Sequence, residues 1–88
     1  MQEREITIMN RLGLHARAAA KLVTLASRYA SSVVLAANGR RANARHFIAV
    51  LMLSAGMGTA VSIQISGPDE TEAMRAVTRL ISNGLGEG

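Results

Sequence analysis

Apolar residues recur with two different periods along this chain, and the order of these periods restricts the fold more than any other feature. Apolar and polar residues nearly alternate over 5–9 and again over 60–66, which is typical of half-buried strands. The pair Asn38-Gly39 favours a tight hairpin, so it predicts that short strands at 33–36 and 41–43 are antiparallel neighbours.

The remaining apolar segments have helical spacing. Apolar residues at i, i+3, i+4 and i+7 predict a helix over about 16–29, and a second amphipathic pattern predicts one over about 70–82. The uninterrupted apolar run 47–53 predicts a short third helix between them. The predicted order is βαββαβα, an α+β fold with antiparallel strands and with helices covering one face of the sheet.

These periods also predict the core and the ends of the elements. The expected inward-facing residues are Ile6, Ile8, Ala19, Leu22, Val23, Ala26, Val61, Ile63, Ile65, Ala73, Val77, Leu80 and Ile81. Asp69 and Glu72 have capping-box spacing at the start of the last helix, and Asn83-Gly84 suits its end. We expect residues 85–88 to form a frayed tail.

Composition adds three limits to this outline. Nearly half of the 88 residues are apolar, so we expect one domain over residues 1–88 with its own core. The absence of cysteine excludes a disulfide framework and a thiolate metal site. The first residues lack the form of a secretory signal, and polar residues interrupt the uncharged stretch 46–68. We therefore expect a cytoplasmic protein that does not insert into membranes. We also expect it to be a monomer.

The charges are distributed unevenly. The net charge is +4, and no Asp or Glu lies between Ile6 and Pro68. The basic residues of that region are Arg11, Arg17, Lys21, Arg28, Arg40, Arg41 and Arg45. Such a surface attracts an anion: an acidic protein, a phosphate group or a nucleic acid. A solvated face that keeps the protein soluble is the simpler explanation.

The start of the first predicted helix has unusual chemistry. Helices usually begin after Ser, Thr, Asp or Asn, yet His15 precedes this one and Arg17 lies in its first turn. The first backbone N–H groups and the helix dipole make such an end positive, and the guanidinium adds a planar donor suited to phosphate oxygens. Both features favour the neutral, nucleophilic imidazole. We therefore predict that His15 accepts a phosphoryl group, which completes the cap.

Other roles for this histidine have less support. An incidental loop histidine at a poorly capped helix is the structural alternative, and the local chemistry alone does not decide between the two. His46 is the only other histidine, and two histidines without a carboxylate cluster make a poor metal site. A catalytic triad would need a carboxylate in the middle of the chain to orient the imidazole. We expect no metal and no cofactor, and we expect that His46 does not share a positive helix end.

The residues around His15 also resemble a known signature. Leu12-Gly13-Leu14-His15-Ala16-Arg17, with Ala19 and Lys21-Leu22 after it, resembles the active site of the HPr family, the histidine-containing phosphocarriers of the bacterial phosphotransferase system. The similarity continues at Asn38-Gly39, residues 47–53, Gly58 and residues 67–70. It therefore spans essentially the whole chain.

The resemblance implies an open-faced β-sandwich, in which three helices cover one side of a four-stranded antiparallel sheet. It implies that enzyme I phosphorylates Nδ1 of His15 at the expense of phosphoenolpyruvate, and that the group passes to an enzyme IIA domain. Arg17 and the amides of Ala16 and Arg17 would hold the phosphoryl oxygens. The apolar Phe47, Ile48 and Leu51 match the docking patch of the family. We assign Lys21, Arg45 and His46 to the same partner surface.

Two residues depart from the pattern of the family. Ala18 stands where proline usually follows the arginine, and it returns one backbone donor to the first turn. His46 stands where many members carry a regulatory serine. The chain could therefore serve sugar uptake or a nitrogen-regulatory branch.

Two other function classes compete with the phosphocarrier. A small basic α/β nucleic-acid-binding module would account for the arginines, but one Tyr and one Phe give almost no platform for stacking bases. A regulatory domain that docks without carrying phosphate would not need both His15 and Arg17.

Overall fold

The computed structural model describes residues 1–86 and contains four strands, three α-helices and one 3₁₀ turn. The elements, in chain order, are β1 (Gln2–Thr7), α1 (Ala16–Ala26), β2 (Ser32–Ala37), β3 (Arg40–Asn43), α2 (Phe47–Leu51), β4 (Ala60–Ser66), α3 (Glu70–Ser82) and η1 (Gly84–Gly86). The predicted order βαββαβα is confirmed.

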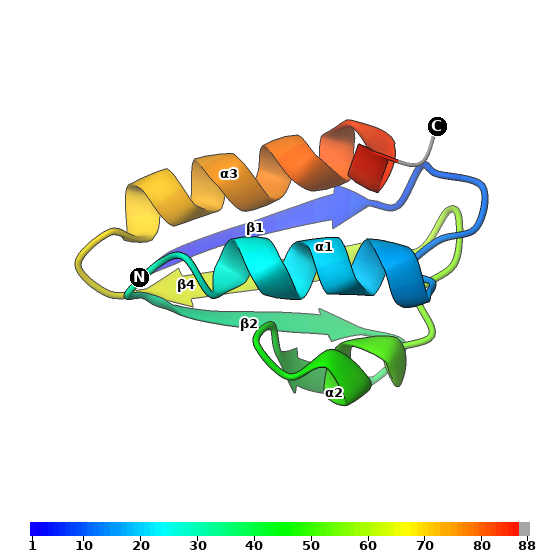
Figure 1. Ribbon diagram of the computed structural model, residues 1–88, viewed down its shortest axis with the longest axis horizontal. Coiled ribbons are helices and arrows are strands. Elements are labelled where there is room, and N and C mark those ends of the chain that lie inside the picture. The colour runs from blue at the N-terminus through cyan, green and yellow to red at the C-terminus, as the bar shows by residue number, and fades with distance from the viewer. Residues whose placement is uncertain (87–88) are drawn as a thin grey trace.

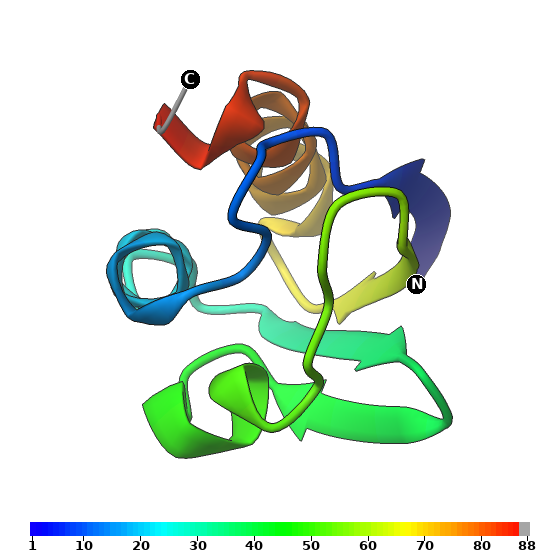
Figure 2. The same cartoon turned by 90° about the vertical axis from the view of Figure 1, so that its right-hand side faces the viewer.

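The strands form one antiparallel sheet in the order β1-β4-β2-β3. Figures 1 and 2 show α1, α2 and α3 on the same side of this sheet, with α1 between the other two helices. This arrangement confirms the open-faced β-sandwich.

The hairpin between β2 and β3 turns at the predicted pair. Asn38 and Gly39 both have positive φ (53° and 76°), which is the backbone pattern of a type I′ turn. The Asn38 side chain also donates hydrogen bonds to the carbonyls of Leu53 at 2.9 Å and Ser54 at 3.0 Å. The hairpin is thereby tied to the end of the α2 segment.

The core lies between the sheet and the helices. Its largest fully buried side chains are Ile8, Leu22, Val33, Leu35, Val50, Leu53, Val61, Ile63, Ile65, Val77, Ile81 and Leu85. Ile6, Val23 and Leu80, predicted as core, are only partly buried. Ala18 and Met74 are buried in α1 and α3 instead.

The tail was predicted wrongly. Leu85 is fully buried and lies in η1, so the chain returns to the core after α3 rather than fraying. The part of the expected tail at residues 87–88 lies outside the described residues.

Three elements, β1, α1 and α2, differ from their predicted ranges by more than one residue at an end. β1 begins at Gln2 and ends at Thr7, earlier than expected, because backbone pairing with β4 includes its charged residues. α1 ends at Ala26, where the Ser27 hydroxyl donates to the Val23 carbonyl at 2.8 Å. α2 ends at Leu51, and the chain turns at Ser54, whose φ is 52°.

The prediction of a capping box at the start of α3 is also wrong. Asp69 is the N-cap residue, but its carboxylate leaves the helix and accepts hydrogen bonds from the amides of Ala30 and Ser31, both at 2.9 Å, and from the Ser31 hydroxyl. These hydrogen bonds, that of the Ser31 hydroxyl first, hold the pKa of Asp69 below its ordinary value. The carboxylate therefore fastens the α1–β2 loop to the start of α3.

Candidate functional site

His15 occupies the N-cap position of α1. Its backbone is extended (φ −74°, ψ 177°), and its carbonyl accepts the first helical hydrogen bond, from the Ala19 amide at 2.8 Å. Within residues 1–86, its imidazole makes no capping hydrogen bond to the first turn, and that turn contains no acidic residue. The amides before Ala19 therefore lie at a positively polarised helix end, which favours an anion.

The fold covers one ring nitrogen of His15. Nε2 is buried, although the residue as a whole is partly exposed. An incoming group therefore cannot reach Nε2 unless the surrounding side chains move.

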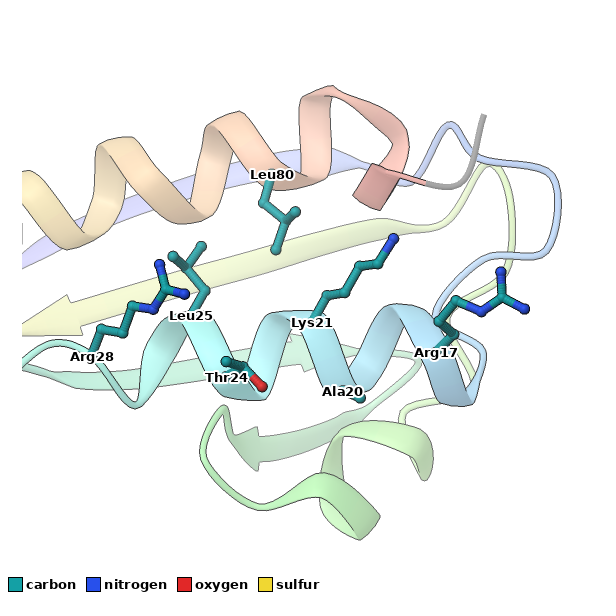
Figure 3. A pocket seen from close by; sticks show the side chains of 7 residues that line it. All are labelled: Arg17, Ala20, Lys21, Thr24, Leu25, Arg28 and Leu80. Atoms are coloured by element: carbon teal, nitrogen blue, oxygen red, sulfur yellow. The ribbon is translucent and has the colours of Figure 1, made fainter.

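Arg17 supplies a cation to the same helix end. It is exposed in the first turn of α1, and Figure 3 shows its side chain extending outward from that turn. The neighbouring Ala18 and Ala19 are fully buried, so the first turn is packed against the core. The charge is thus carried by an ordered part of the helix rather than by a loose loop.

The loop that carries His15 is held against the α2–β4 loop. The Leu14 amide donates to the Ala55 carbonyl at 2.8 Å, and Gly13 approaches Ala55 and Gly56 closely. The buried Asn10 side chain donates to the Gly13 carbonyl at 2.8 Å. Sequence reasoning missed Asn10, because only the folded loop shows that this polar side chain is buried.

His46 occupies an equivalent position at the start of α2, contrary to expectation. It is the N-cap residue of that helix, and within residues 1–86 its side chain makes no capping hydrogen bond either. α2 has only 5 residues, however, compared with 11 in α1. A short helix aligns fewer peptide dipoles, so its end attracts an anion less strongly.

The predicted docking residues of α2 differ in exposure. Ile48 is 66% exposed, whereas Phe47 and Leu51 are partly buried against the core. Met52, which the sequence analysis did not include, is 53% exposed beside them. Met9, Leu12 and Met57 in the neighbouring loops are also exposed, so apolar surface extends beyond α2.

Two of the predicted basic partner residues have contacts within the chain. The Lys21 ammonium donates to the carbonyls of Leu85 at 3.3 Å and Gly86 at 3.5 Å. The Arg45 guanidinium donates to the carbonyls of Tyr29 and Ser31. Both side chains therefore join separate segments of the fold, a role that sequence reasoning missed.

The structure adds two observations on metal and membrane. In residues 1–86, no three His, Cys, Asp or Glu side chains gather to form a metal site. None of the helices in that part of the chain has the length and hydropathy needed to cross a bilayer.

Known proteins resemble this chain in both sequence and fold. The family described as the PTS HPr component phosphorylation site matches residues 2–83. A phosphocarrier protein HPr from Cupriavidus necator is 50% identical over 88 residues, covering 100% of this chain and 99% of the relative. One from Pseudomonas aeruginosa is 46% identical over 85 residues, covering 96% and 94%.

The fold also matches that of a solved structure. The crystal structure of an HPr from Thermoanaerobacter tengcongensis superposes with a TM-score of 0.94 at 35% identity, covering 100% of this chain and 99% of the other. The match extends from β1 through α3, and it includes the helix end at which His15 and Arg17 lie. By sequence and by fold, this chain belongs to the HPr family, the phosphocarrier proteins of the phosphotransferase system.

Proposed function

We propose that Nδ1 of His15 accepts a phosphoryl group from phosphorylated enzyme I and passes it to an enzyme IIA domain. The observation that carries this proposal is the N-terminus of α1, where His15 holds the cap position without a capping hydrogen bond within residues 1–86. A phosphoryl group on Nδ1 would place anionic oxygens near the amides that a capping side chain normally satisfies.

The transfer step follows from this geometry. The lone pair of Nδ1 forms the new N–P bond, while the bond between phosphorus and the donor breaks and its electron pair leaves with the donor. Negative charge is spread over the phosphoryl oxygens during this step. The Arg17 guanidinium and the amides of Ala16 and Arg17 stabilise that charge. Onward transfer to the enzyme IIA domain reverses these roles.

Docking combines an apolar centre with surrounding positive charge. Ile48 is exposed on α2, with Phe47 and Leu51 beside it in the helix. Lys21, Arg45 and His46 add basic character that steers acidic partner surfaces towards the site. The hydrogen bonds of Lys21 and Arg45 within the chain leave their positive charges in place.

The remaining parts of the proposal concern context. Residues 1–88 act as a single cytoplasmic domain, monomeric and without a cofactor, in sugar uptake or in a nitrogen-regulatory branch. His46 offers no hydroxyl to a serine kinase, so we expect no serine phosphorylation at that position. Phosphoryl transfer to each purified IIA domain of the source organism distinguishes the two branches.

Incubation with enzyme I and phosphoenolpyruvate tests the assignment of His15. Intact mass spectrometry is expected to show one acid-labile phosphoryl group on the wild type and on His46→Ala. His15→Ala should carry none. Because both histidines are N-cap residues, His46→Ala is a matched control. Full phosphorylation of His15→Ala would refute the proposal.

A further inference from the structure

A groove lies along the seam between α1 and α3. Figure 1 shows that α3 and α2 lie on opposite sides of α1, and Figure 3 shows the side chains that line one part of the groove. It consists of two adjoining hollows of about 420 and 480 Å³, which share Leu25 and Leu80. In Figure 3 these two leucines point towards each other across the seam. Leu25, Tyr29 and Leu80 are partly buried, so the groove has an apolar floor.

Contacts at both ends fix the width of this groove. Near the start of α1, the Lys21 ammonium donates to the Leu85 carbonyl in η1 at 3.3 Å. Near the other end, the Asp69 carboxylate accepts the amides of Ala30 and Ser31, which joins the segment after α1 to the start of α3. A preformed groove loses little conformational entropy when it binds a partner.

The rims of the groove are basic. Arg17, Lys21 and Arg28 lie along the α1 rim, and Arg75 and Arg79 lie along the α3 rim. Within residues 1–86, the guanidinium groups of Arg28, Arg75 and Arg79 form no ion pair. Glu72 is the single acidic residue among those that line the two hollows in this part of the chain.

We propose that this groove binds an acidic amphipathic helix of a protein partner, at a surface that adjoins Arg17 and Lys21 but lies apart from the apolar docking residues of α2. Apolar side chains of the bound helix pack on Leu25 and Leu80, and its carboxylates face Arg28, Arg75 and Arg79. The 11 residues of α1 span about 16 Å, so the groove accommodates roughly three turns of a helix. A partner held there leaves Ile48 and Met52 uncovered on α2.

The chemistry of the groove favours a protein segment over other anions. Its floor is mostly aliphatic, and Tyr29 is the single aromatic residue lining it within residues 1–86, which is a poor platform for stacked bases. The apolar residues lie between basic side chains on both rims, whereas a helix that binds a bilayer surface presents its apolar residues on one face and its basic residues on the other. An apolar floor between two basic rims complements a helix with an apolar stripe and acidic flanks.

A synthetic peptide tests the proposal on unphosphorylated protein, so the result does not depend on the phosphocarrier role. The probe is a peptide of about fourteen residues, with Leu at i, i+3, i+4 and i+7 and Glu at most other positions. A peptide of the same composition in scrambled order serves as its control. Titration followed by ¹H–¹⁵N NMR is expected to shift the resonances of Leu25, Leu80 and their neighbours, with saturation.

Three variants locate the binding site. Arg79→Glu reverses a rim charge and should weaken binding roughly fivefold, since an exposed ion pair contributes up to about 1 kcal/mol. Ala76→Gln fills part of the groove without changing charge, and should weaken binding as well. Arg40→Glu makes the same charge reversal on β3, away from the groove, and should change the affinity by less than about twofold.

Three results would overturn the proposal. One is equal binding of the scrambled peptide, which would show that charge alone attracts the probe. Another is a set of shifts centred on Ile48 and Met52 of α2. The third is an equal loss of affinity in Arg40→Glu and Arg79→Glu. Circular dichroism of each variant establishes that the fold is retained before the affinities are compared.

Discussion

Replacement of Gly13 by alanine tests how the His15 loop is supported. Gly13 has a φ of +65°, which L-residues adopt at a cost of about 1–2 kcal/mol. An added Cβ would lie 2.5 Å from the Ala55 carbonyl oxygen and 2.6 Å from the Gly56 Cα. Both atoms belong to backbone, so one of the two loops must move by about 1 Å to reach an ordinary contact distance.

The expected loss of stability follows from the cost of the positive φ and the cost of the steric overlap. Overpacking of a tightly packed site typically costs about 1–3 kcal/mol. Together with the backbone cost, Gly13→Ala should lower the free energy of unfolding by about 2–5 kcal/mol. In a domain of this size, each kcal/mol lowers the Tm by about 4–8 °C. The same loop movement weakens the hydrogen bond between the Leu14 amide and the Ala55 carbonyl.

Gly39→Ala provides the matched control. Gly39 has a similar φ of +76°, but no described atom lies within 4 Å of its added Cβ. Its substitution should therefore cost only the backbone strain, about 1–2 kcal/mol. Urea denaturation of both variants isolates the steric contribution at Gly13. Equal destabilisation of the two variants would refute the close packing of the His15 loop against residues 55–56.

Four further substitutions test the site and the fold. Arg17→Ala should fold normally and slow phosphoryl transfer roughly 10²–10³-fold in single-turnover kinetics, because it removes an exposed charge beside the phosphoryl oxygens; an unchanged rate would show that the helix amides suffice. Ile48→Ser should weaken enzyme I binding roughly tenfold in calorimetric titration without changing the Tm, since Ile48 is exposed. Phe47→Ser should also lower the Tm, because Phe47 is partly buried against the core. A drop in Tm for Ile48→Ser would contradict the docking assignment. Hydrogen bonding lowers the pKa of Asp69 in the folded state, so the ionised carboxylate stabilises the fold at pH values above the ordinary pKa of Asp. This stabilisation is lost as the pH falls below about 4 and the carboxylate becomes protonated. The Tm of Asp69→Asn should therefore fall less steeply with acid than that of the wild type, and parallel profiles would count against the link.

The sequence predicts best where the pattern that defines an element is local. β4 matches its predicted range of 60–66, because the alternation of Val61, Ile63 and Ile65 is unbroken. The start of β1 was missed because the edge strand carries charged residues, which hide the alternation although the backbone still pairs with β4. The position of His15 at the N-terminus of a helix was also predicted, because the helical spacing of the apolar residues that follow it is a local pattern.

Contacts between distant parts of the chain could not be predicted in this way. Asp69 satisfies amides 38 and 39 residues away instead of capping its own helix. Leu85 is buried by contacts with α1 and α3, although its neighbours in sequence are typical of a tail. The sequence indicates only that Lys21 and Arg45 are surface charges, yet each side chain donates a hydrogen bond to a backbone carbonyl in a distant segment of the fold. Periodicity carries no information about such partners.

The two histidines show why a local motif does not by itself define a phosphoryl acceptor. Both are N-cap residues followed by a helix without acid in its first turn. The partial charges at the two ends of the 5-residue α2 lie about 7.5 Å apart, so they cancel more than those of the 11-residue α1, about 16 Å apart. α1 also buries Ala18 and Ala19 within its first turn, which fixes the helix end against the core. Helix length and burial therefore favour His15 over His46 as the proposed phosphoryl acceptor.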